Sequence, residues 1–567
     1  MPRMVIDPVT RVGGQLRLEA QVEAGAVRDA WLSGTMYRGV ERILVGRDPR
    51  EAWLLAQRIC GTCGTAHALA SVRAVEGALG IRVPRNARLL RNLVAGTQLV
   101  ANHVAAFFQR QLLDWVDVAA AVRADPAGAV DFARSLGVAE LPGVDAFEAV
   151  RKRLEASVES GGGPFSGGPW GHPAYRLSPA ADLVLLSHAF AALEWRRRFT
   201  SIQTLIGGKT PHPQSFLVGG MATAPGWGGP SDVAPGQHLW GTGRKVPSAL
   251  GTARLDAIRA LVDEAAVFAE EVFLPDAIAV ASAHPEWAAV GRGRRHFLAF
   301  GDLPEDDAER PALLLPRGRV MDGDVSRLVE VDQSGVGESV DHAWYEPTEE
   351  PLRRPRDRGS APRYDGPRGR FTTLEGAERY SWVKAPRYED DPIEVGPLAR
   401  VLVATAAGEG DVPLRFQRAM ALTGGPADAA FGTLGRLVAP AVEAVVVARA
   451  MRGWLDDLEA NLADGDLAVA DVSLWDPASW PAAAEGWSIG ESGRGAVGHW
   501  LAIHGGRIER YTVVDAGTWN ASPRDNRGRR GAIEEALVGT PVEDPERPIE
   551  ILRVVHAFDP CLTCGVH

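Results

Sequence analysis

Two short cysteine motifs constrain this chain more than any other feature, because they lie at opposite ends of 567 residues. All four cysteines belong to two CxxC pairs, Cys60/Cys63 in RICGTCGTAH and Cys561/Cys564 in DPCLTCGVH. A chain this long with so few cysteines is not held together by disulfides. Metal ligands so near a chain end are useful only if the tail is anchored. We therefore expect the fold to bring the two pairs together as halves of one site.

Composition excludes several classes of protein. Hydrophobic residues make up 46% of the chain and charged residues 23%, which is typical of a globular protein with a large core. The net charge of -11 and the absence of a basic stripe argue against nucleic-acid binding. The sequence has no uncharged apolar stretch of transmembrane length, and residues 1–10 lack the apolar region of a signal peptide. If the protein leaves the cytoplasm, we expect another chain to carry the export signal.

Hydrophobic patterning predicts long helices between two hairpins. Residues 15–34 alternate apolar and polar side chains around Gly25, and residues 499–514 do so around Gly505 and Gly506, so each segment is expected to form a β-hairpin. Apolar residues recur at helical spacing in residues 48–60, 68–80, 86–122, 179–206, 248–284 and 413–463.

The segments between these elements are rich in glycine, proline and charge. Residues 160–175 are expected to form a rigid loop, and residues 345–371 a surface excursion. There is no internal repeat and no convincing domain linker. We therefore predict one integrated domain over residues 1–567, mainly α with small β-sheets (α+β), in which a bundle of long helices forms the core between the N- and C-terminal hairpins.

The chemistry of four thiolates narrows the choice of metal. Soft sulfur ligands select zinc, iron-sulfur clusters, copper(I) or nickel over hard, oxygen-seeking ions, and spacing alone does not choose among them. Two separate redox dithiols fit poorly, since such motifs lie at a strand-to-helix junction of a small domain. A structural zinc site is the simplest alternative. However, the apolar helical run before Cys60, together with His67 and His567, is unusual for a closed zinc site.

The two motifs resemble CGxCxxxH and DPCxxCxxH of the large subunit of nickel-iron hydrogenases, in particular uptake-type members. The resemblance extends along nearly the whole chain, through blocks in the family's order. These blocks include DPVTRVGGQLRLE, YRGVERILVGRDPREA, WGHPAYRLSP, GGKTPHPQSFLVGGM, YSWVKAPRYEDDPIEVGPLAR, GRGAVGHW and TWNASPRD. It implies the hydrogenase large-subunit fold and the heterolytic cleavage of H2 to protons and electrons.

The resemblance assigns a role to each cysteine. Cys60 and Cys561 would be terminal thiolates on nickel, and Cys63 and Cys564 would bridge nickel to an iron that carries one carbon monoxide and two cyanide ligands. Cys561 would also take the proton during H2 cleavage. Electron-rich sulfur suits nickel, so the implied ligand set is chemically reasonable.

The resemblance also implies a set of surrounding residues. Arg494 would overhang the metal site, and Asp114 would hold its guanidinium in place, although without the motif the two would be a buried structural ion pair. His67, with Arg58, would lie beside the bridging thiolates.

A second ion is implied at the end of the chain. Glu41 and His567 resemble the ligands of Mg2+ or a similar divalent ion that locks the tail. The chain ends where the family's maturation protease cuts, so we expect either a mature form or a member made without an extension.

Several positions depart from the family pattern. Gly13 stands where a glutamate usually relays protons, and a glycine cannot accept a proton. Gly493 replaces a proline, and Ala516 and Gly517 replace a proline and a serine or threonine that would donate to cyanide. These changes suggest an altered proton path, oxygen response, catalytic bias or rate, and lost catalysis is the alternative.

Partners follow from the resemblance and from the cysteine count. With no further cysteine to hold a cluster, electrons would leave through a small subunit that carries iron-sulfur clusters, in a heterodimer or an oligomer of heterodimers. Peripheral membrane association would come through partners, and the location would be periplasmic by co-export with the small subunit, or cytoplasmic. A hydrogen sensor with low turnover is the alternative to an H2-oxidising enzyme.

Overall fold

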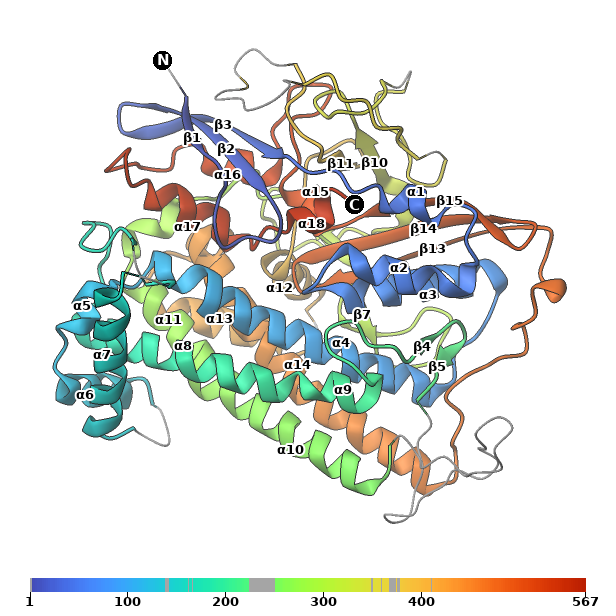
Figure 1. Ribbon diagram of the computed structural model, residues 1–567, viewed down its shortest axis with the longest axis horizontal. Helices are drawn as coiled ribbons and strands as arrows, with labels where there is room; N and C mark the ends of the chain where they lie inside the picture. The colour runs from blue at the N-terminus through green and yellow to red at the C-terminus, as the bar shows by residue number, and fades with distance from the viewer. Residues whose placement is uncertain are drawn as a thin grey trace.

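The computed structural model describes residues 3–137, 142–161, 163–165, 167–223, 250–347, 350–357, 359–366, 374, 378–408 and 410–567. Long helices form one side of the molecule, and small sheets and loops cover the other (Figure 1). Within this part of the chain, no helix has the length and apolar character needed to span a membrane. The predicted loop at 160–175 and the excursion at 345–371 lie partly outside the described residues.

The helical core is built around α14 (Thr433–Ala463), which packs along α4 (Arg85–Ala105) and α10 (Thr252–Phe268). Figure 1 shows α4 and α10 running beside α14, and α8 packs against α4 and α10. The N-terminal half of α14 is buried on all sides, which is expected of a helix enclosed by other helices. The predicted segment 413–463 is two helices, because the chain turns at Gly424, where φ is +70°, before Pro426. The long-helix core predicted from the sequence is confirmed.

The remaining elements are mostly short. The other α-helices are α1 (Val40–Leu44), α2 (Ala52–Ala56), α3 (Gly64–Leu79), α5 (Val118–Val122), α6 (Pro126–Ser135), α7 (Val144–Glu159), α8 (Pro179–Phe199), α9 (Ser201–Gly207), α11 (Leu274–Ser282), α12 (Pro397–Ala407), α13 (Val412–Leu422), α15 (Ala516–Asn520), α16 (Ala532–Leu537), α17 (Ile549–Ala557) and α18 (Leu562–Gly565). Two-residue to four-residue strands form the small central sheets: β4 (Phe216–Leu217), β5 (Gly220–Met221), β6 (Phe297–Ala299), β7 (Asp302–Pro304), β8 (Leu313–Leu315), β9 (Gly318–Val320), β10 (Val336–Ser339), β11 (Ala385–Tyr388) and β12 (Glu394–Val395).

The N-terminal hairpin is confirmed and gains a third strand. Strands β2 (Leu16–Glu23) and β3 (Ala26–Gly34) pair in antiparallel fashion around Gly25, where φ is +74°. The short β1 (Met4–Ile6) adds to the outer edge of β2.

The C-terminal hairpin is also confirmed and belongs to a three-stranded sheet. Strands β14 (Gly495–His504) and β15 (Arg507–Val514) turn at Gly505 and Gly506, as predicted. Strand β13 (Ala483–Ser492), which the sequence did not reveal, pairs with β14 and packs against α3. Its turn into β14 carries Gly493 and Arg494 to the centre of the protein.

The two ends of the chain meet in the interior. Gly13 forms an isolated parallel bridge with Cys561, and the C-terminus lies among α15, α18 and β11 (Figure 1). The main apolar cluster extends from Val9 to Val566. This shared core favours the single-domain interpretation, which stays a prediction.

Candidate metal centre

The four cysteines come from two loops that face each other. Cys60 is extended at the end of the 3-10 turn η2 (Gln57–Ile59), and Cys63 lies at the N-terminus of α3. Cys561 and Cys564 lie at the start of α18 and within it. All four are free, and none is more than 2% exposed. The fold therefore joins the two motifs, as their positions predicted.

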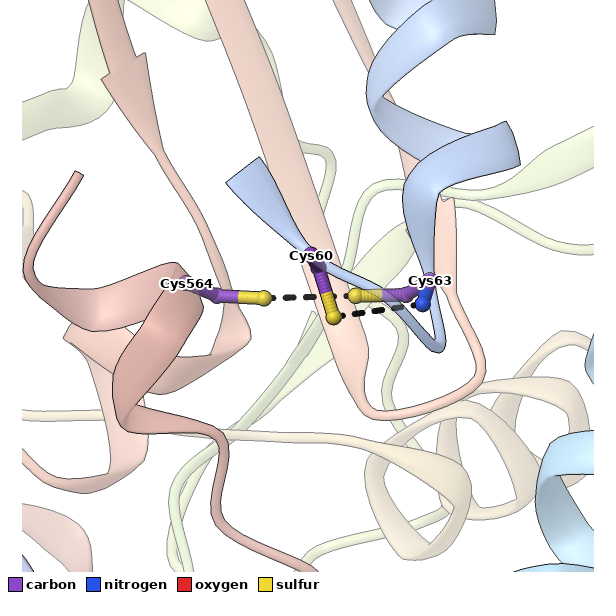
Figure 2. Close-up of side chains that lie close together, drawn as sticks. All are labelled: Cys60, Cys63 and Cys564. Carbon is purple, nitrogen blue, oxygen red and sulfur yellow. Dashed lines mark hydrogen bonds between the residues drawn. The ribbon is translucent and has the colours of Figure 1, made fainter. Parts of the chain in front are cut away.

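The sulfur atoms point at one another. Cys63 Sγ lies 3.2 Å from Cys564 Sγ, Cys561 Sγ lies 3.2 Å from Cys564 Sγ, and Cys60 Sγ lies 3.7 Å from Cys561 Sγ. Figure 2 shows the sulfurs of Cys60, Cys63 and Cys564 converging from the two loops. These separations are too long for a disulfide and suit thiolates that share a metal. A soft metal centre fits this donor set.

The surroundings favour thiolate at Cys60. Its Sγ accepts hydrogen bonds from the backbone N–H groups of Thr62 and Cys63, at 3.3 and 3.2 Å. Contacts with the other cysteines, above all Cys561, together with the charge of Arg494, hold the pKa of Cys60 well below its usual value. This loop is prepared to carry negative charge.

Arg494 covers this sulfur cluster from the tip of the β13–β14 turn. Its Nη1 donates to Thr62 Oγ1 at 2.7 Å, and its Nε lies 2.9 Å from both the backbone oxygen and Oδ2 of Asp559. Burial opposes its charge, but Asp559 and the neighbouring thiolates raise the pKa of Arg494 well above its usual value. The guanidinium is thus fixed and permanently charged above the site.

The predicted contact between Asp114 and Arg494 is wrong. Asp114 is 1% exposed and instead pairs with Arg11 Nη2 at 2.5 Å and with His556 Nδ1 at 2.7 Å. The π-helical segment η3 (Ala106–Gln111) follows α4 and, with the 3-10 turn η4 (Leu112–Asp114), contacts α17, which carries His556. Asp559, two residues before Cys561, takes the place that Asp114 was expected to fill.

His67 lies in the first turn of α3, but its ring contacts another histidine. Its Nδ1 is 3.1 Å from His499 Nε2, and His499 Nδ1 is 2.7 Å from the hydroxyl of Tyr511. Burial lowers the pKa of His67, which favours the neutral ring. Its cofactor-binding role stays a prediction. Arg58 contacts His212, whose other ring nitrogen is 3.0 Å from the Cys60 carbonyl oxygen.

Glu41 and His567 meet beside the buried C-terminus. Glu41 Oε1 lies 3.4 Å from His567 Nε2 and 3.3 Å from the ammonium of Lys384, and it accepts from the Val513 N–H at 2.9 Å. Burial opposes its ionisation, but Lys384 and His567 lower the pKa of Glu41 to about 2. Burial would likewise lower the pKa of His567, but Asp515 and Glu41 raise it to about 10. The predicted pair is therefore assembled, with Lys384 as a neighbour that the sequence did not suggest.

Gly13 and Gly517, which depart from the family pattern, both pack closely against the C-terminal cysteine loop. The Gly13 carbonyl accepts from the Leu562 N–H at 2.5 Å, and a Cβ at Gly13 would lie 2.9 Å from Cys561 Sγ. A Cβ at Gly517 would lie only 2.2 Å from the Cys561 carbonyl oxygen. Residue 13 therefore faces Cys561 Sγ, and residue 517 must be small so that α15 can approach α18.

Comparison with known proteins decides the family. A family model described as nickel-dependent hydrogenase matches residues 38–567, which include all four cysteines. The chain belongs to the nickel-dependent hydrogenase family. This membership confirms the resemblance found in the sequence and argues against a structural zinc site.

Curated hydrogenases match the entire chain. The uptake hydrogenase large subunit of Bradyrhizobium diazoefficiens is 41% identical, and the hydrogenase-1 large chain of Escherichia coli K12 is 39% identical; each alignment covers 100% of this chain and 95% of the relative. Among solved structures, the Ni-Fe-Se hydrogenase from D. vulgaris Hildenborough in the as-isolated oxidized state has a TM-score of 0.78 at 31% identity, with 100% of both chains covered. These relatives confirm the fold class and do not favour the hydrogen-sensing alternative.

Sequence reasoning missed several residues of this hydrogenase centre. Asp559 belongs to the DPC motif, but its pairing with Arg494 was not predicted. The only signal in the sequence was that the positive charge of Arg494 needs an acidic partner. Arg110 donates to the Asp559 carboxylate at 2.5 and 2.9 Å, so two guanidinium groups share one acid. The hydroxyls of Thr62 and Thr563 lie 3.2 Å from Cys60 Sγ and 2.9 Å from Cys561 Sγ. No spacing pattern in the sequence pointed to Arg110 or to these hydroxyls.

Proposed function

We propose that this protein is the catalytic subunit of a nickel-iron hydrogenase that oxidises H2 to protons and electrons, reversibly in principle. The convergence of four buried, free cysteines from opposite ends of the chain carries this proposal. When bound, a nickel-iron centre with one carbon monoxide and two cyanide ligands on iron supplies the site of heterolytic H2 cleavage.

The cysteine pairs support a division of roles. Cys63 and Cys564, at 3.2 Å, would bridge nickel and iron, and Cys60 and Cys561, at 3.7 Å, would be terminal ligands on nickel. The backbone N–H groups of Thr62 and Cys63 donate to Cys60 Sγ, and the Thr563 hydroxyl lies 2.9 Å from Cys561 Sγ, so each terminal ligand would have a polar neighbour that orients it.

The residues around the sulfurs would orient charge and move the proton. Arg494 places a fixed positive charge beside the sulfur atoms, and this charge keeps the metal site polar. Cys561 Sγ would take the proton, and the half-buried Thr563 hydroxyl, 2.9 Å away, can pass it towards solvent. Gly13 supplies no acid, which is why a hydroxyl or ordered water is needed here.

A divalent ion such as Mg2+ would strengthen the anchoring of the tail. The carboxylate of Glu41 and the carbonyl oxygen of Val513 would supply oxygen ligands, and the imidazole of His567, whose Nε2 lies 2.8 Å from the Val513 oxygen, would join them after that nitrogen loses its proton. Carboxylate and carbonyl oxygens suit a hard cation.

Electrons require a partner. All four cysteines belong to the metal centre, so the chain holds none for an iron-sulfur cluster. A small subunit with such clusters would form a heterodimer, or an oligomer of heterodimers, and could provide export to the periplasm and peripheral membrane association.

Infrared spectroscopy of the purified protein, with metal analysis, tests the proposal. We expect one carbon monoxide and two cyanide bands that shift under H2, together with nickel and iron. H2 uptake with an artificial electron acceptor then separates an enzyme from a sensor. A blank spectral window with zinc bound would refute the assignment.

A further inference from the structure

The turn that carries Arg494 to the metal centre has little rigidity of its own. Gly493 and Arg494 join β13 to β14, and Gly495, where φ is +135°, begins β14. Glycine has no Cβ to restrict its backbone, so the two glycines beside Arg494 leave the path of this turn open. The contacts of Arg494 with Thr62 and Asp559 hold the tip of its side chain. The backbone at the base of the turn needs restraints from elsewhere in the fold.

A buried arginine supplies restraints at the base of this turn. Arg400 lies near the start of α12, a helix that contacts both α14 and β14 (Figure 1). It is 1% exposed, and it donates from Nη1 to the Ser492 carbonyl oxygen at 2.9 Å and from Nη2 to the Gly493 carbonyl oxygen at 3.3 Å. These carbonyl groups belong to the two peptide groups that lead into Arg494. Arg400 therefore fixes the direction in which the chain enters that residue.

Two buried acids anchor Arg400. Its Nε and Nη2 donate to the two carboxylate oxygens of Glu443 on α14, each at 2.6 Å, and its Nη1 donates to Glu491 Oε2 on β13 at 2.8 Å. Together with the two carbonyl contacts, these bonds use every N–H group of the guanidinium.

The two acids differ in strength as anchors. Burial opposes the ionisation of Glu443, but Arg400 and His103 lower its pKa to about 2, so Glu443 stays charged. Burial raises the pKa of Glu491 to about 7, so Glu491 is the weaker anchor. The bidentate contact with Glu443 thus fixes the plane of the guanidinium, and that plane determines where the two carbonyl groups of the turn can lie.

We propose that Arg400 is a positioning residue for H2 cleavage: anchored by Glu443, it holds the carbonyl groups of Ser492 and Gly493 and thereby directs Arg494 at the thiolates. This inference rests on the proposed hydrogenase function. The hydrogen bonds of Arg400 reach none of the cysteines, so it would act through the turn. A planar fork suits this role, because it binds a carboxylate and carbonyl oxygens at the same time in one fixed geometry.

Infrared spectroscopy of the metal-loaded protein in complex with its partner, together with H2 uptake kinetics, tests the proposal. Arg400→Lys keeps the positive charge but loses the fork, so it cannot hold both acids and both carbonyl groups. We expect kcat to fall about tenfold with KM nearly unchanged, because Arg494 would lose its position. The carbon monoxide and cyanide bands should shift, since the charge of Arg494 would move relative to the thiolates.

Arg387→Lys is the matched control. Arg387 is also 1% exposed, pairs with Asp525 at 2.8 Å and donates to backbone carbonyl oxygens, but those belong to Pro386, Pro523 and Arg529 and not to the β13–β14 turn. The infrared bands and the kcat of the metal-loaded Arg387→Lys protein should match those of the wild type.

A double-mutant cycle separates positioning from a general loss of stability. Arg494→Gln lacks the guanidinium, so adding Arg400→Lys to it should cause no further band shift. If Arg400→Lys does not fold, as judged by circular dichroism, Glu491→Gln removes the charge of one anchor and should shift the bands only while Arg494 is present.

The outcomes are distinct. Unchanged bands in the folded variant, or the same band shift with and without Arg494, would overturn the proposal and leave the hydrogenase function intact. A wild type without carbon monoxide and cyanide bands would reject the hydrogenase function and this inference with it.

Discussion

The position of Arg494 above the metal centre should depend on Asp559 and not on Asp114. Replacing Asp559 with Asn keeps the shape of the side chain but removes the charge that pairs with Arg494 Nε at 2.9 Å and with Arg110. The matched variant Asp114→Asn changes a carboxylate that pairs with Arg11 and His556 instead.

The two substitutions should affect different quantities: kcat in Asp559→Asn and the free energy of unfolding in Asp114→Asn. A hydrogen bond to a charged group contributes about 1.5–3 kcal/mol, and about 1.4 kcal/mol corresponds to a tenfold change in rate. If the Asp559 contact serves to hold Arg494 in position, Asp559→Asn should lower kcat about tenfold or more. Asp114 is 1% exposed and pairs with the guanidinium of Arg11 and the ring of His556, so Asp114→Asn should cost about 3–5 kcal/mol of unfolding free energy and change kcat little.

The assay combines H2 uptake kinetics with denaturant unfolding of the same preparations. We expect Asp559→Asn to lower kcat with KM nearly unchanged and the metal content intact, as for a group that acts mainly in the transition state. If Asp114→Asn lowered kcat as much as Asp559→Asn while stability stayed the same, the assignment of Arg494 to Asp559 would be refuted.

Three further predictions concern proton transfer, packing and pH. Gly13→Glu and Gly13→Ala both place a Cβ 2.9 Å from Cys561 Sγ, but only the glutamate adds a carboxylate, so only Gly13→Glu should raise the rate of hydrogen/deuterium exchange catalysed by the enzyme. Equal rates in the two variants would show that the proton leaves elsewhere. Gly517→Ala should lower both the melting temperature and the nickel content, because its Cβ would lie 2.2 Å from the Cys561 carbonyl oxygen; an unchanged protein would contradict this close packing. Burial opposes the ionisation of Glu443, but Arg400 and His103 lower its pKa to about 2. The ionised Glu443 should therefore stabilise the protein fully above pH 4.5, and this stabilisation should be lost as the pH falls towards 2. The difference in unfolding free energy between wild type and Glu443→Gln should be about 3 kcal/mol at pH 7 and should become smaller below pH 4.5. A difference that grows in acid would contradict this prediction.

The amino-acid sequence by itself determined the ligand chemistry and most of the elements. Four cysteines in two CxxC pairs favour soft metals over hard ions, since ligand type is a property of the residue, but only the fold brings the two pairs together. The hairpins around Gly25 and Gly505 were predictable because period-2 alternation and a glycine turn are local signals. The long helices were predictable because the spacing of apolar residues along a helix is also a local signal, although the sequence analysis did not predict the break at Gly424.

Only the tertiary structure decided which charges meet. The sequence does not distinguish Asp114 from Asp559 as the partner of Arg494, and the fold pairs Asp114 with Arg11 and His556 instead. Sequence patterns report on neighbours along the chain, whereas an ion pair between residues 65 positions apart depends on how helices and turns pack.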